Sequence, residues 1–182
     1  SDVYKRQEQE TEAVDESQTT ETENKITLDA SGNAAAGDQS TENKTAEPST
    51  LDELFGGENL SVTYTGAEIA ANYMEGGYYS LDAEQGKTFV IVGIDITNSG
   101  ADEIAIDNFA KTPKFSVMVN GQEKAEEENT ILPSDFALYQ ETVPAGVTEN
   151  TILLFQVPDS VTSVDSLDLF VNISGTNYQI TL

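Results

Sequence analysis

The sequence predicts an all-β protein, an antiparallel β-sandwich preceded by a disordered acidic N-terminal tail. Residues 51–182 hold eight or nine short runs in which apolar and polar side chains alternate, and turn residues separate the runs. Long helical periodicity is absent, which favours two packed sheets. Residues 1–50 contain almost no large apolar side chain. We therefore expect a spacer over residues 1–50 and one folded domain over residues 51–182.

The predicted spacer is too polar to form a core. Residues 8–48 are mostly Glu, Thr, Ser, Gln, Asn, Ala and Gly, with three isolated aliphatic residues. Such a segment cannot bury enough apolar surface to offset the entropy of ordering. Residues 1–7 contain the only arginine and resemble translated adapter sequence. We treat them as foreign, so the natural spacer is expected to start at Glu8 or upstream.

The strongest strand pattern in the sequence lies in the first half of the domain, at residues 87–97. In the run 87–97, Val90, Val92, Ile94 and Ile96 share one face, while the opposite face begins apolar and then becomes polar. This pattern is typical of a central strand whose far end reaches solvent. The elements before it are a helical turn at 48–54 capped by Ser49 or Thr50, strands at 59–66 and 68–74, and a hairpin turn at Gly76-Gly77.

The second half continues as strands and tight turns. Asn120-Gly121 favours a type I′ hairpin after the strand 114–120. The expected order is then an acidic loop at 124–129, a weak strand at 136–143, a strand at 150–157, and a closing hairpin of 166–174 with 177–182. Eight or nine strands in a chain of this length predict an immunoglobulin-like sandwich, with a closed barrel as the alternative.

The composition excludes several kinds of chemistry. The chain has no cysteine and no histidine, so disulfides, the usual zinc sites, and nucleophiles activated by histidine are all absent. No phosphate-binding glycine loop is present, and we expect no cofactor and no enzyme activity. The sequence contains no run of about 18 apolar residues, so it predicts no membrane-spanning segment.

The charge restricts the partners. Residues 1–50 carry a net charge of −8 and residues 51–182 a net charge of −17. Such a surface repels nucleic acid and anionic lipid headgroups, and it favours a soluble monomer. We expect a protein or glycan partner, with cationic groups preferred. Most of the acidic side chains are interpreted as solvated surface, including the loop residues Glu126-Glu127-Glu128.

Two groups of residues are candidates for ligand contacts. Asp102, Glu103 and Asp107 surround a turn and form a weak candidate cation site, although their spacing does not match a calcium-binding loop. Tyr73, Tyr78 and Tyr79 are grouped around the Gly76-Gly77 turn, where aromatic faces could stack on sugars or peptides. The alternative is that one or two of these tyrosines pack inward.

A family resemblance follows from several motifs. The string GKTFVIVGIDITNSG (residues 86–100), the turn 143–146, the strand end 154–158 and the residues 167–169 resemble immunoglobulin-like domains of unknown function in surface lipoproteins of Firmicutes and related Gram-positive bacteria. The match covers about residues 58–182. The resemblance implies a two-sheet sandwich on the outer face of the cell membrane, behind a spacer and a lipid-modified cysteine. That cysteine is not in this chain, and the resemblance brings no catalytic residues.

We therefore interpret the chain as an extracytoplasmic, lipid-anchored surface protein with a binding or structural role. Membrane attachment is expected only through an anchor outside this sequence. Two alternatives stay open: a glycan- or small-ligand-binding module that uses the three tyrosines, and a hydrolase that uses a pair of carboxylates.

Overall fold

The computed structural model describes residues 46–182. The expectations for the spacer, other than those for residues 46–50, lie outside the described residues. No helix in the described part of the chain is long and apolar enough to cross a membrane.

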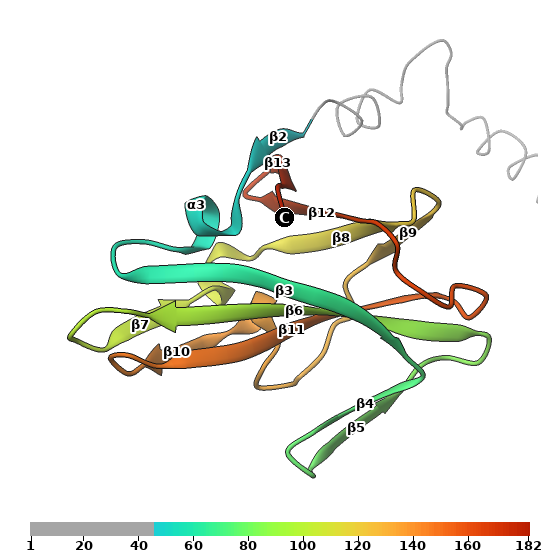
Figure 1. Cartoon of the computed structure of the whole chain (residues 1–182), viewed down its shortest axis with the longest axis horizontal. Helices are drawn as coiled ribbons and strands as arrows, with labels where there is room; N and C mark the ends of the chain where they lie inside the picture. The colour runs from blue at the N-terminus through green and yellow to red at the C-terminus, as the bar shows by residue number, and fades with distance from the viewer. Residues whose placement is uncertain (1–45) are drawn as a thin grey trace, which may run out of the picture. The chain divides into compact units, whose positions relative to one another are not determined.

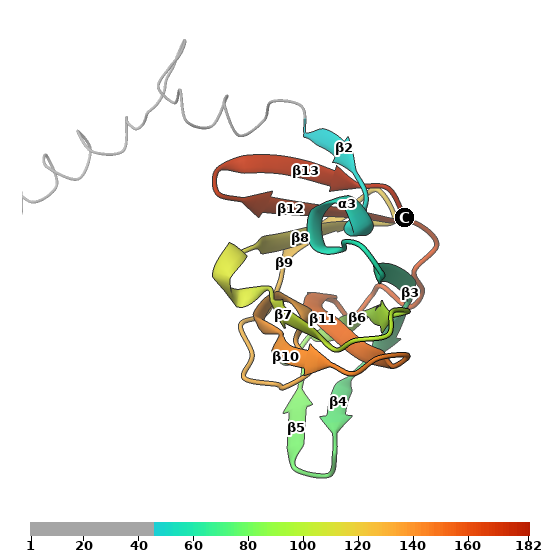
Figure 2. The same ribbon diagram turned by 90° about the vertical axis from the view of Figure 1, so that its left-hand side faces the viewer.

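Two β-sheets pack face to face as the layers of a sandwich (Figures 1 and 2). The three-stranded sheet has the order β11-β6-β3, formed by Thr148–Pro158, Lys87–Asn98 and Leu60–Ala70. The five-stranded sheet has the order β2-β13-β12-β8-β9, formed by Glu47–Ser49, Thr176–Ile180, Leu167–Ile173, Lys114–Val119 and Glu123–Glu126. The predicted all-β sandwich is confirmed, and its two sheets do not join into a barrel.

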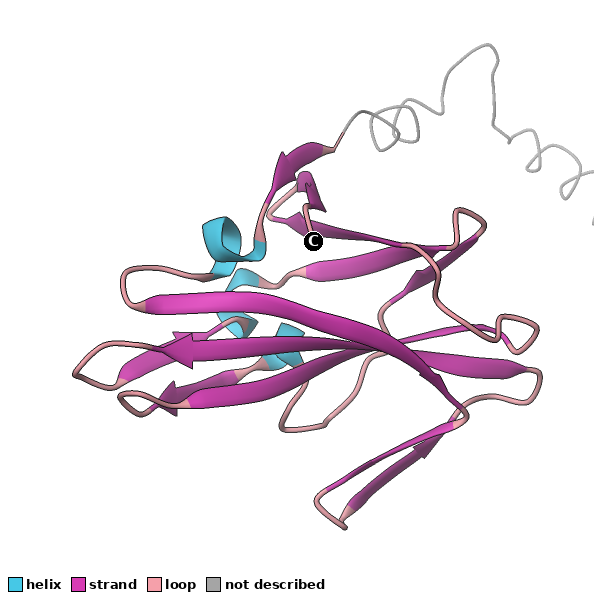
Figure 3. Cartoon of the chain, in the orientation of Figure 1, coloured by secondary structure: helices cyan, strands magenta, loops and turns pink. Residues whose placement is uncertain are grey.

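Two short strand pairs complete the fold. Strands β4 (Asn72–Glu75) and β5 (Tyr79–Asp82) form a hairpin that projects from the three-stranded sheet (Figure 2). Strands β7 (Ile104–Asp107) and β10 (Gln140–Val143) pair with each other. Within residues 46–182, helix is limited to α3 (Leu51–Phe55) and two 3₁₀ turns, at Phe109–Lys111 and Phe136–Leu138 (Figure 3).

The compact unit begins at Ala46, upstream of the boundary expected at residue 51. The added residues form β2, which runs parallel to β13, whereas the other strand pairs in the described part of the chain are antiparallel. The predicted helical turn is present as α3. Its cap is Thr50, whose hydroxyl accepts a hydrogen bond from the Glu53 amide at 3.0 Å, while the Glu53 carboxylate accepts one from the Thr50 amide at 3.0 Å. This reciprocal pair satisfies two amides at the start of the helix.

The inner face of β6 forms the centre of the core, as its sequence predicts. Val90, Val92, Ile94 and Ile96 are all buried between the two sheets. Three aromatic rings, from Phe55, Phe115 and Phe136, close one part of this core, with centroids 5.0–6.0 Å apart. They come from α3, β8 and the 3₁₀ turn Phe136–Leu138. The three rings therefore pack the helix, one strand of the five-stranded sheet and the turn before β10 against one another.

The turn after β6 is held by a buried side chain. Asn98 is fully buried, and its amide nitrogen donates to the carbonyl oxygens of Asp102 at 2.8 Å and Val143 at 3.0 Å. Its side-chain oxygen accepts from the Gly100 amide at 2.9 Å. The Asn-Ser-Gly turn of the sequence therefore joins β6 to the end of β10.

Two local predictions are wrong. The acidic loop expected at 124–129 begins instead as strand β9, because Glu123–Glu126 pairs with β8 across the Asn120-Gly121 turn. The strand expected over 136–143 is a 3₁₀ turn followed by the short strand β10. Both segments alternate too weakly for their pairing to be read from the sequence.

Candidate functional site

A second apolar cluster lies on the outer face of the three-stranded sheet. Phe89, Ile91 and Leu154 project from β6 and β11 on the side away from the main core, and they pack with Leu132. They are buried because two segments cover them: the hairpin β4–β5 and the connection 127–135, which we call the strap.

The strap is hydrogen bonded to both sheets and to the hairpin. The amide of Glu127 donates to the Phe115 carbonyl in β8 at 3.1 Å, and the amide of Glu128 donates to the Leu154 carbonyl in β11 at 2.8 Å. At its far end, Ser134 donates from both its amide and its hydroxyl to the carboxylate of Glu75 in β4. The strap therefore crosses from one sheet to the other and fastens the hairpin.

The strap encloses a pair of carboxyl groups. Asp135 is 2% exposed, and its carboxylate accepts hydrogen bonds from the Thr130 hydroxyl at 2.6 Å and the Ala137 amide at 3.0 Å. Burial, followed by a hydrogen bond to Asp135 and the negative charge of that residue, raises the pKa of Glu127 to about 10. The Glu127 carboxyl group therefore keeps its proton at neutral pH. The interpretation of Glu127 as a solvated loop acid is wrong.

Beside the covered cluster, the outer face is open. A hollow of about 300 Å³ lies over β3, β6 and β11. Its floor follows from the strand register, which places Gly66, Gly93 and Ile152 in one cross-strand row and Glu68, Ile91 and Leu154 in the next. The two glycines have no side chains to fill the space, so the backbone of the sheet is accessible there.

The side chain of Thr65 fills part of this hollow above Gly93. It lies at the β-bulge between Tyr64 and Gly66, where β3 holds one residue more than β6. A Cβ placed on Gly93 would be 2.3 Å from the Thr65 hydroxyl oxygen. The Thr65 hydroxyl therefore occupies the position that a side chain at residue 93 would take.

The substitution Gly93→Ala tests this contact when its effect on stability is compared in two backgrounds. In the parent chain, Thr65 must leave its rotamer, at a cost of about 0.5–1.5 kcal/mol, which offsets the gain from replacing a glycine in a strand. In a Thr65→Ala background the clash is gone, and Gly93→Ala is expected to stabilise the fold by about 0.5–1 kcal/mol. Urea unfolding of the four proteins gives the coupling energy. Equal effects of Gly93→Ala in both backgrounds would contradict the contact.

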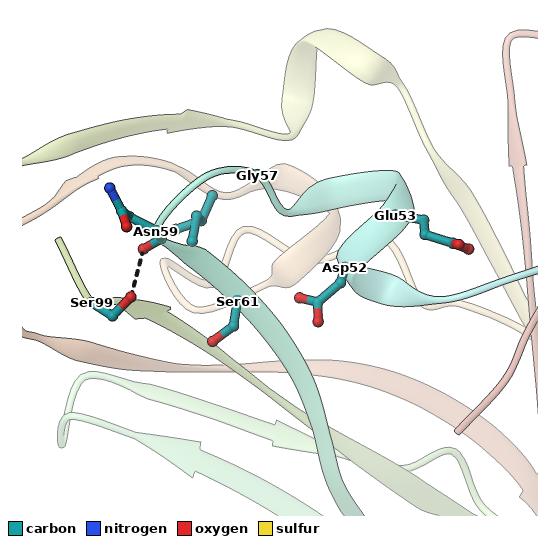
Figure 4. Close-up of a pocket in the computed structure, with 7 residues that line it drawn as sticks. Asp52, Glu53, Gly57, Asn59, Ser61 and Ser99 are labelled. Carbon is teal, nitrogen blue, oxygen red and sulfur yellow. Dashed lines mark hydrogen bonds between the residues drawn. The ribbon is translucent and has the colours of Figure 1, made fainter.

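A larger hollow, about 410 Å³, lies between α3 and the start of β3, and structural hydrogen bonds use its polar groups. The Asp52 carboxylate accepts from the Val62 amide at 2.6 Å, and Ser99 donates to the Asn59 carbonyl at 3.4 Å (Figure 4). Glu53 points away from Asp52 in this view, toward the helix start that it caps. These contacts cover part of the free edge of β3, which protects the edge from pairing with another chain.

The structure places two of the three candidate tyrosines together. Tyr73 and Tyr79 are half-buried against the outer apolar cluster. The Tyr73 hydroxyl donates to Glu75 at 2.8 Å, and the pKa of Tyr73 is raised, chiefly by burial. Tyr78 is separate from them, at the hairpin turn, where it is 92% exposed. The contact of these tyrosines with a ligand stays a prediction.

The three candidate acids are exposed and lie at opposite ends of β7. Asp102 and Glu103 precede the strand and Asp107 ends it, so the length of β7 separates Asp107 from the other two acids. Asp107 is bonded locally, since its carboxylate accepts from the Ala110 amide at 3.0 Å and from Gln140 at 3.3 Å. Within residues 46–182, no three acidic side chains are grouped so that they could hold a metal ion.

Sequence comparison gives no match: no protein-family model and no curated protein matches the chain. Several solved structures are similar to it. An uncharacterised β-sandwich protein from Clostridium difficile 630 has a TM-score of 0.44 and 18% identity, over 75% of this chain and 94% of that one. A conserved hypothetical protein from Bacillus anthracis has a TM-score of 0.38 and 11% identity, over 69% and 89%.

A third similar structure is a candidate lipoprotein from Bacillus subtilis. Its TM-score is 0.36 and its identity is 11%, over 68% of this chain and 36% of that one. Likenesses at these TM-scores carry no argument about function.

Proposed function

We propose that the chain is the extracytoplasmic part of a lipid-anchored surface protein, in which an acidic spacer presents one β-sandwich as a binding module without catalytic activity. The observation that carries the binding role is the open hollow on the outer face, next to a hairpin that projects from the fold. The main core lies on the opposite face of the same sheet, so this hollow is a concave surface separate from the core.

The location rests on the sequence. A long polar spacer before a β-domain, together with the resemblance to surface lipoprotein domains, supports an attached protein outside the membrane. Labelling of intact cells that make the natural protein, using a reagent that does not cross membranes, tests this location. Labelling only after the cells are opened would contradict it.

The hydrolase alternative has one specific candidate, the Glu127–Asp135 pair. These carboxyl groups are hydrogen bonded to each other, so their oxygens are closer than the separation of about 5 Å or more that glycosidases need. Asp135 is also 2% exposed, which leaves no room for a substrate. This pair therefore belongs to the interior of the strap, and the binding role remains the better proposal.

The binding role is tested by nuclear magnetic resonance. We expect the ¹⁵N-labelled full chain, titrated with oligosaccharides and with short peptides, to show saturable shifts of the amides of Gly66, Ile91, Gly93 and Ile152. A Tyr78→Ala variant distinguishes binding at the hollow from glycan binding at the hairpin. If a glycan binds through the hairpin, its affinity for the variant falls, although the variant protein keeps its fold. Ligands that shift neither the hollow nor the hairpin would contradict the proposal.

A further inference from the structure

We propose that the outer-face hollow binds a primary alkylammonium group, the side chain of a lysine in a basic peptide. This inference rests on the proposed binding role and names the ligand class. It follows from three properties of the hollow: an apolar floor, hydrogen-bond acceptors around an open patch of backbone, and negative charge.

The apolar floor fits an aliphatic stem. Ile91 and Ile152 project from neighbouring strands on the outer face, in adjacent cross-strand rows. Gly93 lies opposite Ile152 and Gly66 lies opposite Gly93, so the space over them is free of side chains. The four-carbon stem of lysine is apolar and flexible, and it could lie over Ile152 while its head reaches the glycines. Ile91 borders this space, but its side chain is 7% exposed and belongs to the covered cluster.

Acceptors surround the position where the head would lie. Glu68 is opposite Ile91, on the same face of β3, and it is exposed. Asp95 is two residues beyond Gly93 on β6, so it projects from the same face. The Thr65 hydroxyl lies over Gly93. An ammonium group has three donors and no acceptor, so it can donate to the Glu68 carboxylate and the Thr65 hydroxyl, which both line the hollow, while Asp95 lies further along β6 and adds negative charge on the same face.

A hydrogen bond holds the carboxylate of Asp95 in one orientation. Asn150 donates to one carboxylate oxygen of Asp95 at 2.8 Å, which orients that carboxylate on the outer face. None of the residues that line the hollow, all of which are in the described part of the chain, is basic. The net charge of −17 over residues 51–182 adds a long-range attraction for a cationic ligand. A compact ammonium fits between these groups better than the wider, planar guanidinium of arginine.

The test uses the ¹⁵N-labelled full chain and three pentapeptides: pentalysine, the same peptide with acetylated side chains, and pentaarginine. In 150 mM salt, pentalysine is expected to give saturable shifts at Gly66, Ile91, Gly93 and Ile152, and the acetylated peptide to give none. Pentaarginine is expected to bind the hollow at least threefold more weakly.

Two matched variants locate the contact. Glu68→Gln is expected to weaken pentalysine binding threefold or more, whereas Glu103→Gln removes the same charge from an exposed acid at another place and is expected to change it less than twofold. Equal losses in both variants, or shifts spread over the surface without saturation, would overturn the proposal. If a neutral oligosaccharide shifts the hollow and pentalysine does not, the ligand class is wrong but the binding role stands.

Discussion

Replacing Phe136 by alanine is expected to lower the free energy of unfolding by about 3–5 kcal/mol, the usual cost of deleting a buried aromatic ring. The side chain is fully buried, and its ring lies against those of Phe55 at 5.0 Å and Phe115 at 6.0 Å between centroids. Its backbone is also joined to β7, because Asn108 donates from its side chain to the Phe136 carbonyl at 2.9 Å. The cavity would therefore open where α3, β8 and the β7–β10 pair meet.

Urea unfolding followed by tyrosine fluorescence measures this loss. The matched control is Phe109→Ala, since Phe109 is in the other 3₁₀ turn and is 55% exposed. We expect that substitution to cost less than about 1 kcal/mol. Similar losses from the two substitutions would mean that the buried ring of Phe136 contributes no more to stability than an exposed phenylalanine.

The second large effect is a change in pH dependence. The substitution Glu127→Gln is expected to stabilise the protein at pH 8 by about 2 kcal/mol or more, and to have little effect near pH 4. The folded protein raises the pKa of Glu127 to about 10, far above the value of about 4.3 expected in the unfolded chain. Between these two values the folded state holds a proton that the unfolded state has released.

The sign follows from this difference. The Glu127 contribution to stability is complete below about pH 4 and is lost as the pH rises toward 10, by at most about 1.4 kcal/mol per pH unit. Glutamine carries no proton that can be released, and its amide can still donate to Asp135. The variant therefore keeps the hydrogen bond and loses the pH dependence.

Unfolding free energies measured from pH 4 to pH 9 test this prediction. The other carboxylates of this acidic chain add a pH dependence of their own, so the difference between variant and parent is the informative quantity. Glu128→Gln is the control, because it removes a charge from the neighbouring strap residue. A constant difference between Glu127→Gln and its parent at every pH would show that the carboxyl pair does not share a proton.

The sequence predicts the elements whose patterns are local. The alternation in β6, the Thr50 cap and the Asn120-Gly121 turn are each set by neighbouring residues, and all three are confirmed. The parallel pairing of β2 was not predicted. Its three residues, Glu47–Ser49, have no strand pattern of their own, and they pair because β13 has a free edge.

The site is less predictable than the fold because its groups meet only through the tertiary structure. Glu127 and Asp135 are eight positions apart, and nothing in the acidic run 126–128 distinguishes the one side chain that turns inward. The hollow depends on the register that puts Gly66 opposite Gly93 across a bulge. The one local signal is the glycine within the apolar strand β6, since an isolated glycine in a strand often marks a bulge or a close approach.

The short strand β2 also determines how the molecule would carry mechanical load. The chain enters the sandwich through three residues paired with β13 in the five-stranded sheet, whereas the hollow is on the outer face of the other sheet. Tension between an anchored spacer and a bound ligand would therefore enter through one sheet and leave through the other, across the packed core. The β2–β13 pairing involves only three residues of β2, so we expect it to yield first, and its release would lengthen the tether by a few residues while the three-stranded sheet stayed folded.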